Sequence, residues 1–415
     1  MGQDKRIQPI LLGSDFNVYG MARAFHEAYG VNSIALASAQ LSPTKYSSIV
    51  DVRPQAGFNT PETFIKVMRD FIHNHQQDTD TAYILIACGD GYAELVSMFL
   101  DELSDFFICP YISHDLHQKL ENKKDFYALC DTYDMPYPQT VFVAAEEAGQ
   151  IDQLVEELPF DYPMVLKPNN SISYLETEFE GKKKAYFIDT AAEMKQVLKR
   201  IYTSGYPDEM IIQDMIPGDD THMRVLNVYV DQHHNVRMMS LGHAILEDPA
   251  PAGVGNYLAI LPDENDEICR RIKHFLEDIH YTGFANFDMK YDSRDGQYKL
   301  FEINLRQGRS SFFVTLSGEN MAAQVVNDYV KQVPFEATTY VKGDAVWLGA
   351  PKSLITRYVD DEALVNEVNR LYKAGNYGYT ALYKADRSPL RWLQQTYSLY
   401  RYYSNFKKYF RKKTL

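Results

Sequence analysis

The amino-acid sequence predicts an α/β region at the N-terminal end, followed by α+β regions and a basic C-terminal extension. Three observations indicate this class. Stretches typical of buried strands alternate with helical patterns up to about residue 118. From residue 119 onward, prolines, polar segments and paired strands replace that alternation. From about residue 390 the chain becomes basic and aromatic, with no acidic residue.

The length of 415 residues exceeds that of one ordinary domain, so several packed units are expected. The changes in residue pattern along the chain place domain boundaries after residues 118, 206 and 335. The predicted domains are therefore residues 1–118, 119–206, 207–335 and 336–415.

Composition excludes several classes of protein. Hydrophobic residues make up 45% and charged residues 24% of the chain, as in folded soluble proteins. The net charge of −14 argues against general nucleic-acid binding, which needs a basic surface. Four widely spaced cysteines, no secretory signal and no apolar stretch of about 18 residues predict a cytoplasmic protein with reduced thiols.

The first region reads as a small parallel sheet. Expected strands cover residues 7–12, 33–38 and 83–87, and Thr60-Pro61-Glu62 is a good helix start. The turns at residues 13–15 and 89–91 each follow a strand and precede a helix. Such turns are either purely structural or face a ligand, because ligands in open α/β sheets bind beyond the carboxyl ends of strands.

The second region begins with a helix over residues 122–133, which prolines end. Further helices are expected at residues 146–157 and 191–203, and strands at residues 140–143, 164–167, 185–188, 210–213, 223–230 and 236–243. The polar segment at residues 169–184 is the best candidate for a mobile loop. His233 and His234 lie at an expected hairpin turn, which favours a solvated turn over a metal site.

The most informative passage is GFANFDMKYDSRDGQYKLFEINLRQGRSS, residues 283–311. Two strand-like runs flank a turn containing Asp295 and Gly296, which predicts an antiparallel hairpin. Alternation along a strand places Glu302 and Asn304 on one face, with Asp288 about opposite Glu302. Two carboxylates and an amide oxygen on one face form a cluster suited to Mg²⁺. Separate solvation of the two carboxylates is the alternative.

Cationic, flexible and hydroxyl-bearing residues follow directly: Arg306, Gly308, Arg309, Ser310 and Ser311. They suit an anion such as a phosphoryl group or a carboxylate. Because Mg²⁺ usually bridges carboxylates and nucleotide phosphates, the predicted metal site indicates ATP. Lys167 ends an apolar strand and would supply a charge for the phosphates. The polar edge of the strand at residues 211–216 would hydrogen-bond adenine and ribose.

Taken in this order, the motifs resemble the ATP-grasp enzymes. That resemblance implies a Rossmann-like N-terminal domain followed by two ATP-grasp subdomains. It implies that Lys123 and Lys167 bind ATP phosphates, and that Gln213, Asp214 and Ile216 contact the adenine side. It also implies that Asp288, Glu302 and Asn304 hold Mg²⁺. Many ATP-grasp enzymes carry an acid at the position of Gln213.

LLGSDFNVYGMARAFHEAYG, LIACGDGYAEL, FEGKKKAYF, QDMIPGDD and LFEINLRQGRSSFFVTL are similar to motifs of the D-aspartate ligases of Gram-positive bacteria. This likeness implies that the β-carboxylate of D-aspartate is activated and joined to the lysine side-chain amine of a UDP-linked muramyl pentapeptide. The substrates therefore are expected to be a small amino acid and a peptidoglycan precursor. No motif argued from the residues selects D-aspartate.

The expected chemistry is an acyl-phosphate ligation with ATP and Mg²⁺. Arg306 would stabilise the transferred phosphoryl group, and Arg224 would assist. Residues 169–184 and 242–256 would close over the site and exclude water. No general base is apparent.

Three alternatives remain open at this point. The first is a ligase of the same class that uses another amino acid or a free amine. The second is a non-catalytic nucleotide-binding assembly protein. The third is a dinucleotide oxidoreductase, which the missing GxGxxG motif disfavours.

The C-terminal segment carries many lysines, arginines and aromatic residues and is expected to be helical. One interpretation is docking to an anionic membrane surface or to an anionic substrate carrier. The other is a helix packed through its aromatic face, with a solvated basic end. Oligomeric state is not indicated.

Overall fold

The computed structural model describes residues 5–169, 171–251 and 253–411. Contacts divide the chain into two compact units. The first unit comprises Met1–Glu121, Gly218–Met289 and Glu302–Leu415, and the second comprises Asn122–Pro217 and Lys290–Phe301. The division into four domains at residues 118, 206 and 335 stays a proposal. Lys412 and Lys413 of the basic segment lie outside the described residues.

The first unit begins with a four-stranded sheet in the order β3-β2-β1-β4, in which all neighbouring strands are parallel. The strands are β1 (Arg6–Leu12), β2 (Ser33–Ala37), β3 (Val50–Pro54) and β4 (Thr81–Ala87). The predicted parallel sheet is therefore confirmed. The sequence reading missed β3, because Asp51, Arg53 and Pro54 interrupt its apolar pattern.

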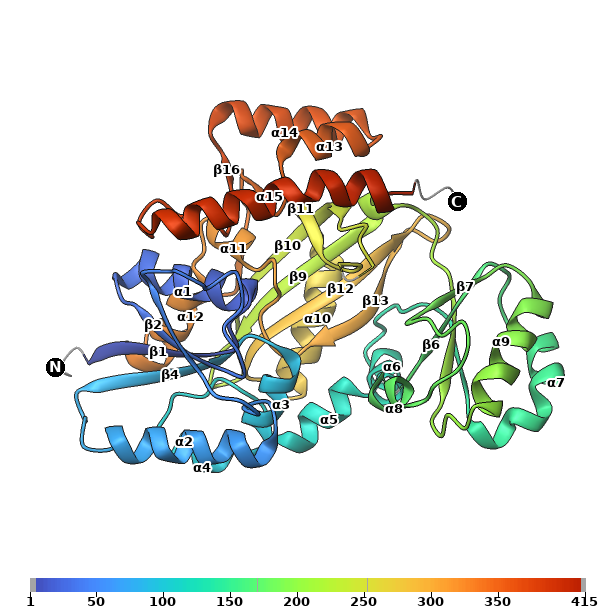
Figure 1. The fold of residues 1–415 in the computed structure, drawn as a ribbon, viewed down its shortest axis with the longest axis horizontal. Helices are drawn as coiled ribbons and strands as arrows, with labels where there is room; N and C mark the ends of the chain where they lie inside the picture. Colours follow the sequence, from blue (N-terminus) through green and yellow to red (C-terminus); the bar gives the residue numbers. More distant parts are fainter. Residues whose placement is uncertain (1–4, 170, 252, 412–415) are drawn as a thin grey trace. The chain divides into compact units, whose positions relative to one another are not determined.

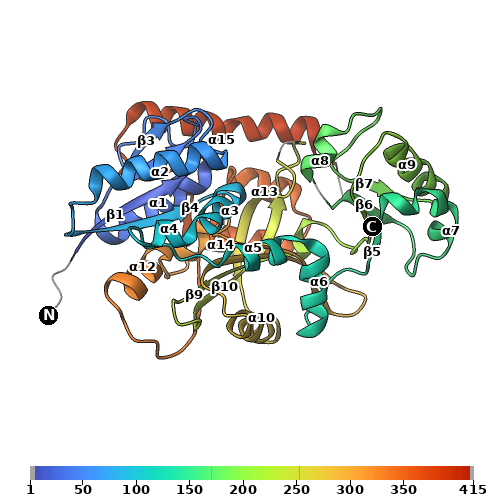
Figure 2. The same ribbon diagram turned by 90° about the horizontal axis from the view of Figure 1, so that it is seen from below.

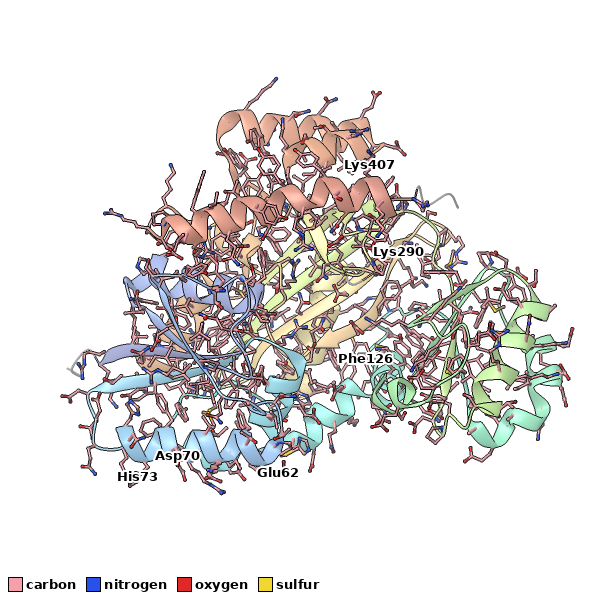
Figure 3. The ribbon with its side chains drawn as sticks, viewed as in Figure 1. Glu62, Asp70, His73, Phe126, Lys290 and Lys407 are labelled. Carbon is pink, nitrogen blue, oxygen red and sulfur yellow. The ribbon has the colours of Figure 1, made fainter. Side chains whose placement is uncertain are left out.

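Helices cover both faces of this sheet (Figure 1). Alternate residues of β1 point to opposite faces. Leu11 packs with the residues of α1 (Phe16–Tyr29), whereas Ile10 and Leu12 pack with those of α2 (Pro61–His75) and α3 (Asp90–Met98). Figure 3 labels Glu62, Asp70 and His73 along α2, which begins at the predicted Pro61 with Thr60 as its N-cap residue. The short helix α4 (Leu100–Ser104) follows α3.

A second sheet has the order β13-β12-β9-β10-β11-β15-β16, and β14 pairs with β10. Its strands are β9 (Met223–Val230), β10 (Val236–Glu247), β11 (Tyr257–Asp263), β12 (Gly283–Asp292), β13 (Gln297–Asn304), β14 (Thr339–Tyr340), β15 (Val346–Leu348) and β16 (Tyr377–Gly378). Both predicted hairpins are present, and His233 and His234 lie in the turn between β9 and β10. β10 continues to Glu247, so only residues 248–256 of the predicted closing segment form a connection, and Ala252 within it lies outside the described residues.

The remaining helices of the first unit are α5 (His114–Glu121), η2 (Asp220–His222), α10 (Asp266–Asp278), α11 (Phe312–Leu316), α12 (Met321–Val325), η3 (Val326–Val330), α13 (Lys352–Tyr358), α14 (Glu362–Ala374) and α15 (Pro389–Tyr409). The last helix, α15, is the long red helix of Figure 1. Within the described part of the chain, none of the helices combines the length and the apolar character that a membrane span requires.

The second unit contains the sheet β5-β8-β6-β7, in which all neighbours are antiparallel. Its strands are β5 (Thr140–Val143), β6 (Met164–Pro168), β7 (Tyr186–Ile188) and β8 (Met210–Asp214). Its helices are α6 (Lys123–Thr132), η1 (Ala145–Gln150), α7 (Ile151–Glu156), α8 (Ser171–Glu176) and α9 (Ala191–Thr203).

The core of the second unit lies between this sheet and helices α7 and α9, which Figure 2 shows beside the strands. Phe126, labelled in Figure 3, is buried on α6. The polar segment at residues 169–184, predicted as a loop, contains the short helix α8. Asn170 in that segment lies outside the described residues.

Candidate active site

The predicted carboxylate cluster forms on the β12–β13 hairpin in the first unit. Asp288 lies on β12, and Glu302 and Asn304 lie on β13. Asp288 Oδ2 accepts a hydrogen bond of 3.0 Å from the Asn304 amide. Asp288 Oδ1 accepts one of 2.8 Å from the hydroxyl of Tyr257, on β11. The hairpin therefore brings the three predicted residues together, and Tyr257 joins them.

Electrostatics at this cluster oppose an isolated negative charge. The pKa of Asp288 is raised to about 7, chiefly by burial and also by the nearby Glu302 carboxylate, although the Tyr257 and Asn304 hydrogen bonds oppose the increase. A cation bound between the two carboxylates would lower the pKa of Asp288. Carboxylate and amide oxygens are the donors that Mg²⁺ prefers, so the residues present fit this ion.

Two details differ from the expected donor arrangement. The Asn304 nitrogen faces Asp288, because a carboxylate attracts the N–H side of an amide, and the Asn304 oxygen accepts from Arg306 at 3.3 Å. Among the described residues, no group of three or more His, Cys, Asp or Glu side chains forms a metal-binding cluster. Asp288 and Glu302 are therefore a two-carboxylate set, typical of an Mg²⁺ that keeps other oxygen ligands.

Arg306 connects this cluster to the N-terminal sheet. Its guanidinium lies 2.8 Å and 3.0 Å from the two oxygens of Asp90, the first residue of α3. Asp90 belongs to the turn at residues 89–91, which the sequence left open as either structural or ligand-facing. The pair shows that this turn meets the residues that follow the hairpin.

The turn after β1 also lies next to the segment that follows β13. The Asn17 amide donates to the carbonyl of Cys88 at 3.0 Å and to the carbonyl of Gln307 at 3.1 Å. The neighbouring Asp15 caps α1 by accepting from the N–H groups of Asn17 and Val18. Burial raises the pKa of Asp15, and hydrogen bonds and the charges of Arg309 and Arg306 lower it. Both βα turns of the first sheet therefore border the candidate site.

Buried amides support the segment after β13. Asn286 receives a hydrogen bond of 3.2 Å from Asn304 and donates one of 3.2 Å to Asn227. A Cβ atom at Gly308 would lie 2.8 Å from the Asn286 side chain, so the backbone approaches closely only because this residue is glycine. Asn17, Asn227, Asn286 and Tyr257 carry no motif that would single them out, and the sequence analysis missed them.

Arg224, unlike Arg306, contacts Asp263 and nearby backbone carbonyls. Its guanidinium pairs with Asp263 on β11 and donates to the carbonyls of Thr221 and Met223. His243 on β10 is its cross-strand neighbour, and burial together with the Arg224 charge lowers the pKa of His243 to about 4. The assisting role of Arg224 in catalysis stays a proposal.

The predicted nucleotide-binding residues all lie in the second unit. Lys167 on β6 donates to Gln213 on β8 at 3.0 Å. Gln213 is buried, and its nitrogen donates to Tyr127 at 3.0 Å and to Thr140 at 2.9 Å. Gln213 thus positions Lys167 from within the sheet. An acid at this place would be harder to bury, which gives a physical reason for the amide.

The other predicted contacts of the adenine side are held by the same unit. Asp214 forms a two-bond ion pair with Arg294. The carbonyl of Ile216 accepts from the Lys290 ammonium at 2.9 Å. Lys123 is the first residue of α6 and is half-buried. These residues border one edge of the second unit, and their contacts with nucleotide stay a proposal.

Comparisons with known proteins identify the family. No protein-family model matches the chain. The chain is 52% identical over 412 residues to the D-aspartate ligase of Enterococcus faecium (strain Aus0004), covering 98% of each chain. Its fold is similar to that of the ADP complex of the N5-carboxyaminoimidazole ribonucleotide synthetase purK, with a TM-score of 0.59, 15% identity and coverage of 98% and 99%.

An L-amino acid ligase from Bacillus licheniformis also shares the fold, with a TM-score of 0.56, 14% identity and coverage of 83% of this chain and 79% of that chain. These neighbours confirm the predicted ATP-grasp architecture, and the Enterococcus relative decides against an oxidoreductase. The chain belongs to the D-aspartate ligase family and is an ATP-dependent carboxylate–amine ligase with the ATP-grasp fold.

Proposed function

We propose that this enzyme uses ATP and Mg²⁺ to activate the β-carboxylate of D-aspartate and joins it to the lysine side-chain amine of a UDP-linked muramyl pentapeptide. The product would be a precursor of peptidoglycan cross-bridges. The observation that carries this proposal is the half-buried Asp288–Glu302 pair near Arg306, in a chain 52% identical to a D-aspartate ligase. A cytoplasmic location fits a reaction that consumes ATP.

The chemistry has two steps. A carboxylate is a poor electrophile, because its charge is delocalised and oxide is a poor leaving group. In the first step a β-carboxylate oxygen bonds to the γ-phosphorus, and the bond to the bridging oxygen breaks to release ADP. In the second step the amine attacks the acyl carbon, and phosphate leaves with the bonding electrons. The amine proton passes to a substrate or phosphate oxygen.

The residues of the chain bind and orient the reactants in this scheme. Asp288, Glu302 and Asn304 would hold Mg²⁺, which neutralises charge on the phosphates. Arg306 stabilises the transferred phosphoryl group, and Arg224 assists it. Asp90 fixes the direction of the Arg306 guanidinium. Catalysis in this class depends mainly on positioning and charge neutralisation.

The second unit would bind the nucleotide. Lys123 and Lys167 would contact phosphates, with Gln213 holding Lys167 in place, while Asp214 and Ile216 would face the adenine side. Residues 169–184 and 248–256 would close over the reactants and exclude water, which would otherwise hydrolyse the acyl phosphate.

The direct test is to incubate the enzyme with ATP, Mg²⁺, muramyl pentapeptide precursor and either D- or L-aspartate, and to weigh the product. The expected product contains one additional aspartyl residue from the D-enantiomer, with one phosphate released per ligation. A panel of other amino acids and free amines covers the alternative ligases. Ligation of a different amino acid in preference to D-aspartate would contradict the substrate assignment.

We also propose that α15 contacts an anionic membrane surface. The helix packs inward through Arg391, Gln395 and Phe406. Its outer side leaves large apolar residues 61–67% exposed: Leu390, Trp392, Leu393, Tyr397 and Tyr400. The alternative in which the aromatic side chains pack against the protein describes only half of them: Phe406 is buried and Tyr402, Tyr409 and Phe410 are half-buried, whereas Trp392, Tyr397, Tyr400 and Tyr403 are exposed.

Charge supports a bilayer over other partners for this surface. No acidic residue follows Asp386, and Lys407, Lys408 and Arg411 accompany the exposed rings in a protein of net charge −14. Figure 3 labels Lys407 near the end of α15. Exposed aromatic residues with flanking cations are typical of helices that lie in a membrane interface.

Sedimentation with lipid vesicles tests this contact. The protein should bind phosphatidylglycerol vesicles better than phosphatidylcholine vesicles, and added salt should weaken binding. Replacing Trp392, Tyr397 and Tyr400 with serine should reduce binding by about tenfold or more. Phe187→Ser, at an exposed ring of the second unit, is the matched control. Equal binding of both vesicle types, or self-association through these rings, would contradict the proposal.

A further inference from the structure

A cavity of about 290 Å³ lies in the first unit beneath α15. One wall is formed by α15, with the half-buried Ser398 and Asn405 and the exposed Arg401. Other lining residues come from several separate places in the chain, including Phe16 at the start of α1, Asp248 after β10 and Arg309 after β13. The cavity is therefore built by tertiary packing.

Two arginines, Arg309 and Arg401, line this cavity. Among the described residues, the side chains of Arg309 and Arg401 form no hydrogen bond and no ion pair. The Arg309 guanidinium lies 4.6 Å from the centre of the Phe16 ring, which fixes its direction while leaving its N–H groups available. Two guanidinium groups at one cavity form a binding site for carboxylate or phosphate groups.

The same cavity contains one acid. Asp248 is half-buried, and its Oδ1 accepts a hydrogen bond of 3.0 Å from the N–H of Ala250. Burial raises the pKa of Asp248, while that hydrogen bond and the charge of Arg309 lower it. The charged lining therefore combines two cations with one anion.

This charge pattern matches an amino-dicarboxylate, which carries two carboxylates and one ammonium. The volume is near the lower limit of about 300 Å³ for ligand pockets, and it therefore suits a small amino acid better than a nucleotide-linked peptide. Arg309 follows Arg306 by three residues, and both charges act on Asp15. A carboxylate bound at Arg309 would therefore lie on the side of the cavity nearer the candidate active site.

We propose that this cavity is the amino-acid site, in which Arg309 and Arg401 bind the two carboxylates of aspartate and Asp248 binds its ammonium. The carboxylate at Arg309 is the one that becomes activated. Three fixed contacts on one small molecule also distinguish its enantiomers. The inference rests on the proposed function, because it assigns the substrate of that reaction to a particular place.

Steady-state kinetics with Arg401→Ala test the carboxylate contact. The variant should raise KM for D-aspartate about 10- to 100-fold, with KM for ATP and for the muramyl pentapeptide precursor unchanged. Arg401→Lys should recover part of the loss. Arg357→Ala, at an exposed arginine on α13, is the matched control and should behave as the wild type. A rise in KM for the precursor alone would assign the cavity to the acceptor and overturn the proposal.

Asp248→Asn tests the ammonium contact independently. Succinate has both carboxylates of aspartate but no ammonium, so the wild-type enzyme should bind it more weakly than D-aspartate. The variant should weaken D-aspartate binding about tenfold or more and should bind succinate at least as well as the wild type does. Calorimetric titration of each ligand in the presence of ADP and Mg²⁺ measures this without turnover.

Different experimental results would refute the cavity assignment and the proposed function. Unchanged D-aspartate affinity in Arg401→Ala and Asp248→Asn, with a wild type that ligates D-aspartate, would refute the cavity but leave the proposed function standing. A wild type that neither binds nor ligates aspartate would refute both.

Discussion

The carboxylates of Asp288 and Glu302 show how local geometry produces an electrostatic demand. They lie on neighbouring strands of one hairpin, and burial with mutual repulsion raises the pKa of Asp288 to about 7. Keeping each carboxylate ionised in this poorly solvated position costs free energy unless a cation lies beside it. A residue pair arranged in this way is typical of function rather than of stability.

Glu302→Gln should reduce ligation by roughly 100-fold or more while the protein remains folded, because it removes a charge and keeps the side-chain shape. Phosphate release measures turnover, and thermal unfolding checks the fold. Glu264→Gln, at a 56% exposed carboxylate on the same unit, is the control. Normal turnover in Glu302→Gln would remove this residue from the site.

Lys167 gives a corresponding prediction in the second unit. Lys167→Ala should weaken ADP binding and abolish measurable ligation, because it removes the cation that Gln213 holds in place. Calorimetry with ADP and Mg²⁺ measures the first effect. Lys199→Ala, which removes only a surface pair with Asp152, should leave ADP binding unchanged. Equal affinity in the two variants would contradict the assignment of Lys167.

Two histidines, the buried His117 and the half-buried His243, predict sensitivity to acid. Burial lowers the pKa of both His117 and His243 to about 4, from an ordinary value of about 6.5. The unfolded chain therefore binds protons that the folded chain does not, and the stability present above pH 6.5 is lost as pH falls toward 4.

Each histidine should contribute roughly 1–3 kcal/mol of this loss. Urea unfolding between pH 7 and pH 4.5 measures it. His117→Gln should make the stability less dependent on pH in this window, and His73→Gln, on the outer part of α2, should not. An identical pH dependence in His117→Gln and the wild type would contradict the expectation.

At the scale of elements, one buried ionic group fixes α15 to the N-terminal sheet. The Arg391 guanidinium lies 3.5 Å from the centre of the Tyr19 ring and donates to the carbonyl of Ala381. Asp386, 3.2 Å from Arg391, also accepts from Tyr19, Ser47 and Ser48. Because the pair is buried, removal of one partner leaves a charge without compensation.

Arg391→Ala should therefore lower the free energy of unfolding by about 3–5 kcal/mol. Loss of α15 docking would also open the cavity beneath it, so D-aspartate affinity should fall together with stability. Thermal unfolding and calorimetry measure the two effects. Arg387→Ala, at an exposed arginine outside the helix, should change neither, and an unaffected melting temperature in Arg391→Ala would contradict the anchoring role.

For the whole molecule, ligand binding should be visible as stability. A ligand at a hundredfold excess over its Kd stabilises the folded state by about 2.7 kcal/mol. ADP with Mg²⁺ should therefore raise the melting temperature, and chelation of the metal should remove part of that increase. Glu302→Gln should lose the metal-dependent part only. Stabilisation by NAD in place of ADP would contradict the nucleotide assignment.

Much of the fold could be predicted from local pattern. Strand alternation predicted the parallel sheet, and the hairpin spacing placed Asp288, Glu302 and Asn304 on one face. The first prediction depends on the alternation of strand-like and helical stretches, and the second on the period of a strand and on a short turn. The strand β3 and the helix α8 were missed, because charged or polar residues obscured their local pattern.

The sequence by itself determined the family, through its motifs, and the carboxylate cluster on the hairpin. The cluster could be predicted because each side chain on a strand points to one of only two faces. Tertiary structure decided which distant groups meet. Arg306 pairs with Asp90 across 216 positions of sequence, and Arg309 and Arg401 face one cavity. It also decided that Trp392, Tyr397 and Tyr400 of α15 are exposed while Phe406 is buried. Such contacts depend on how separate elements pack, and the residues themselves carry no local periodicity that would reveal them.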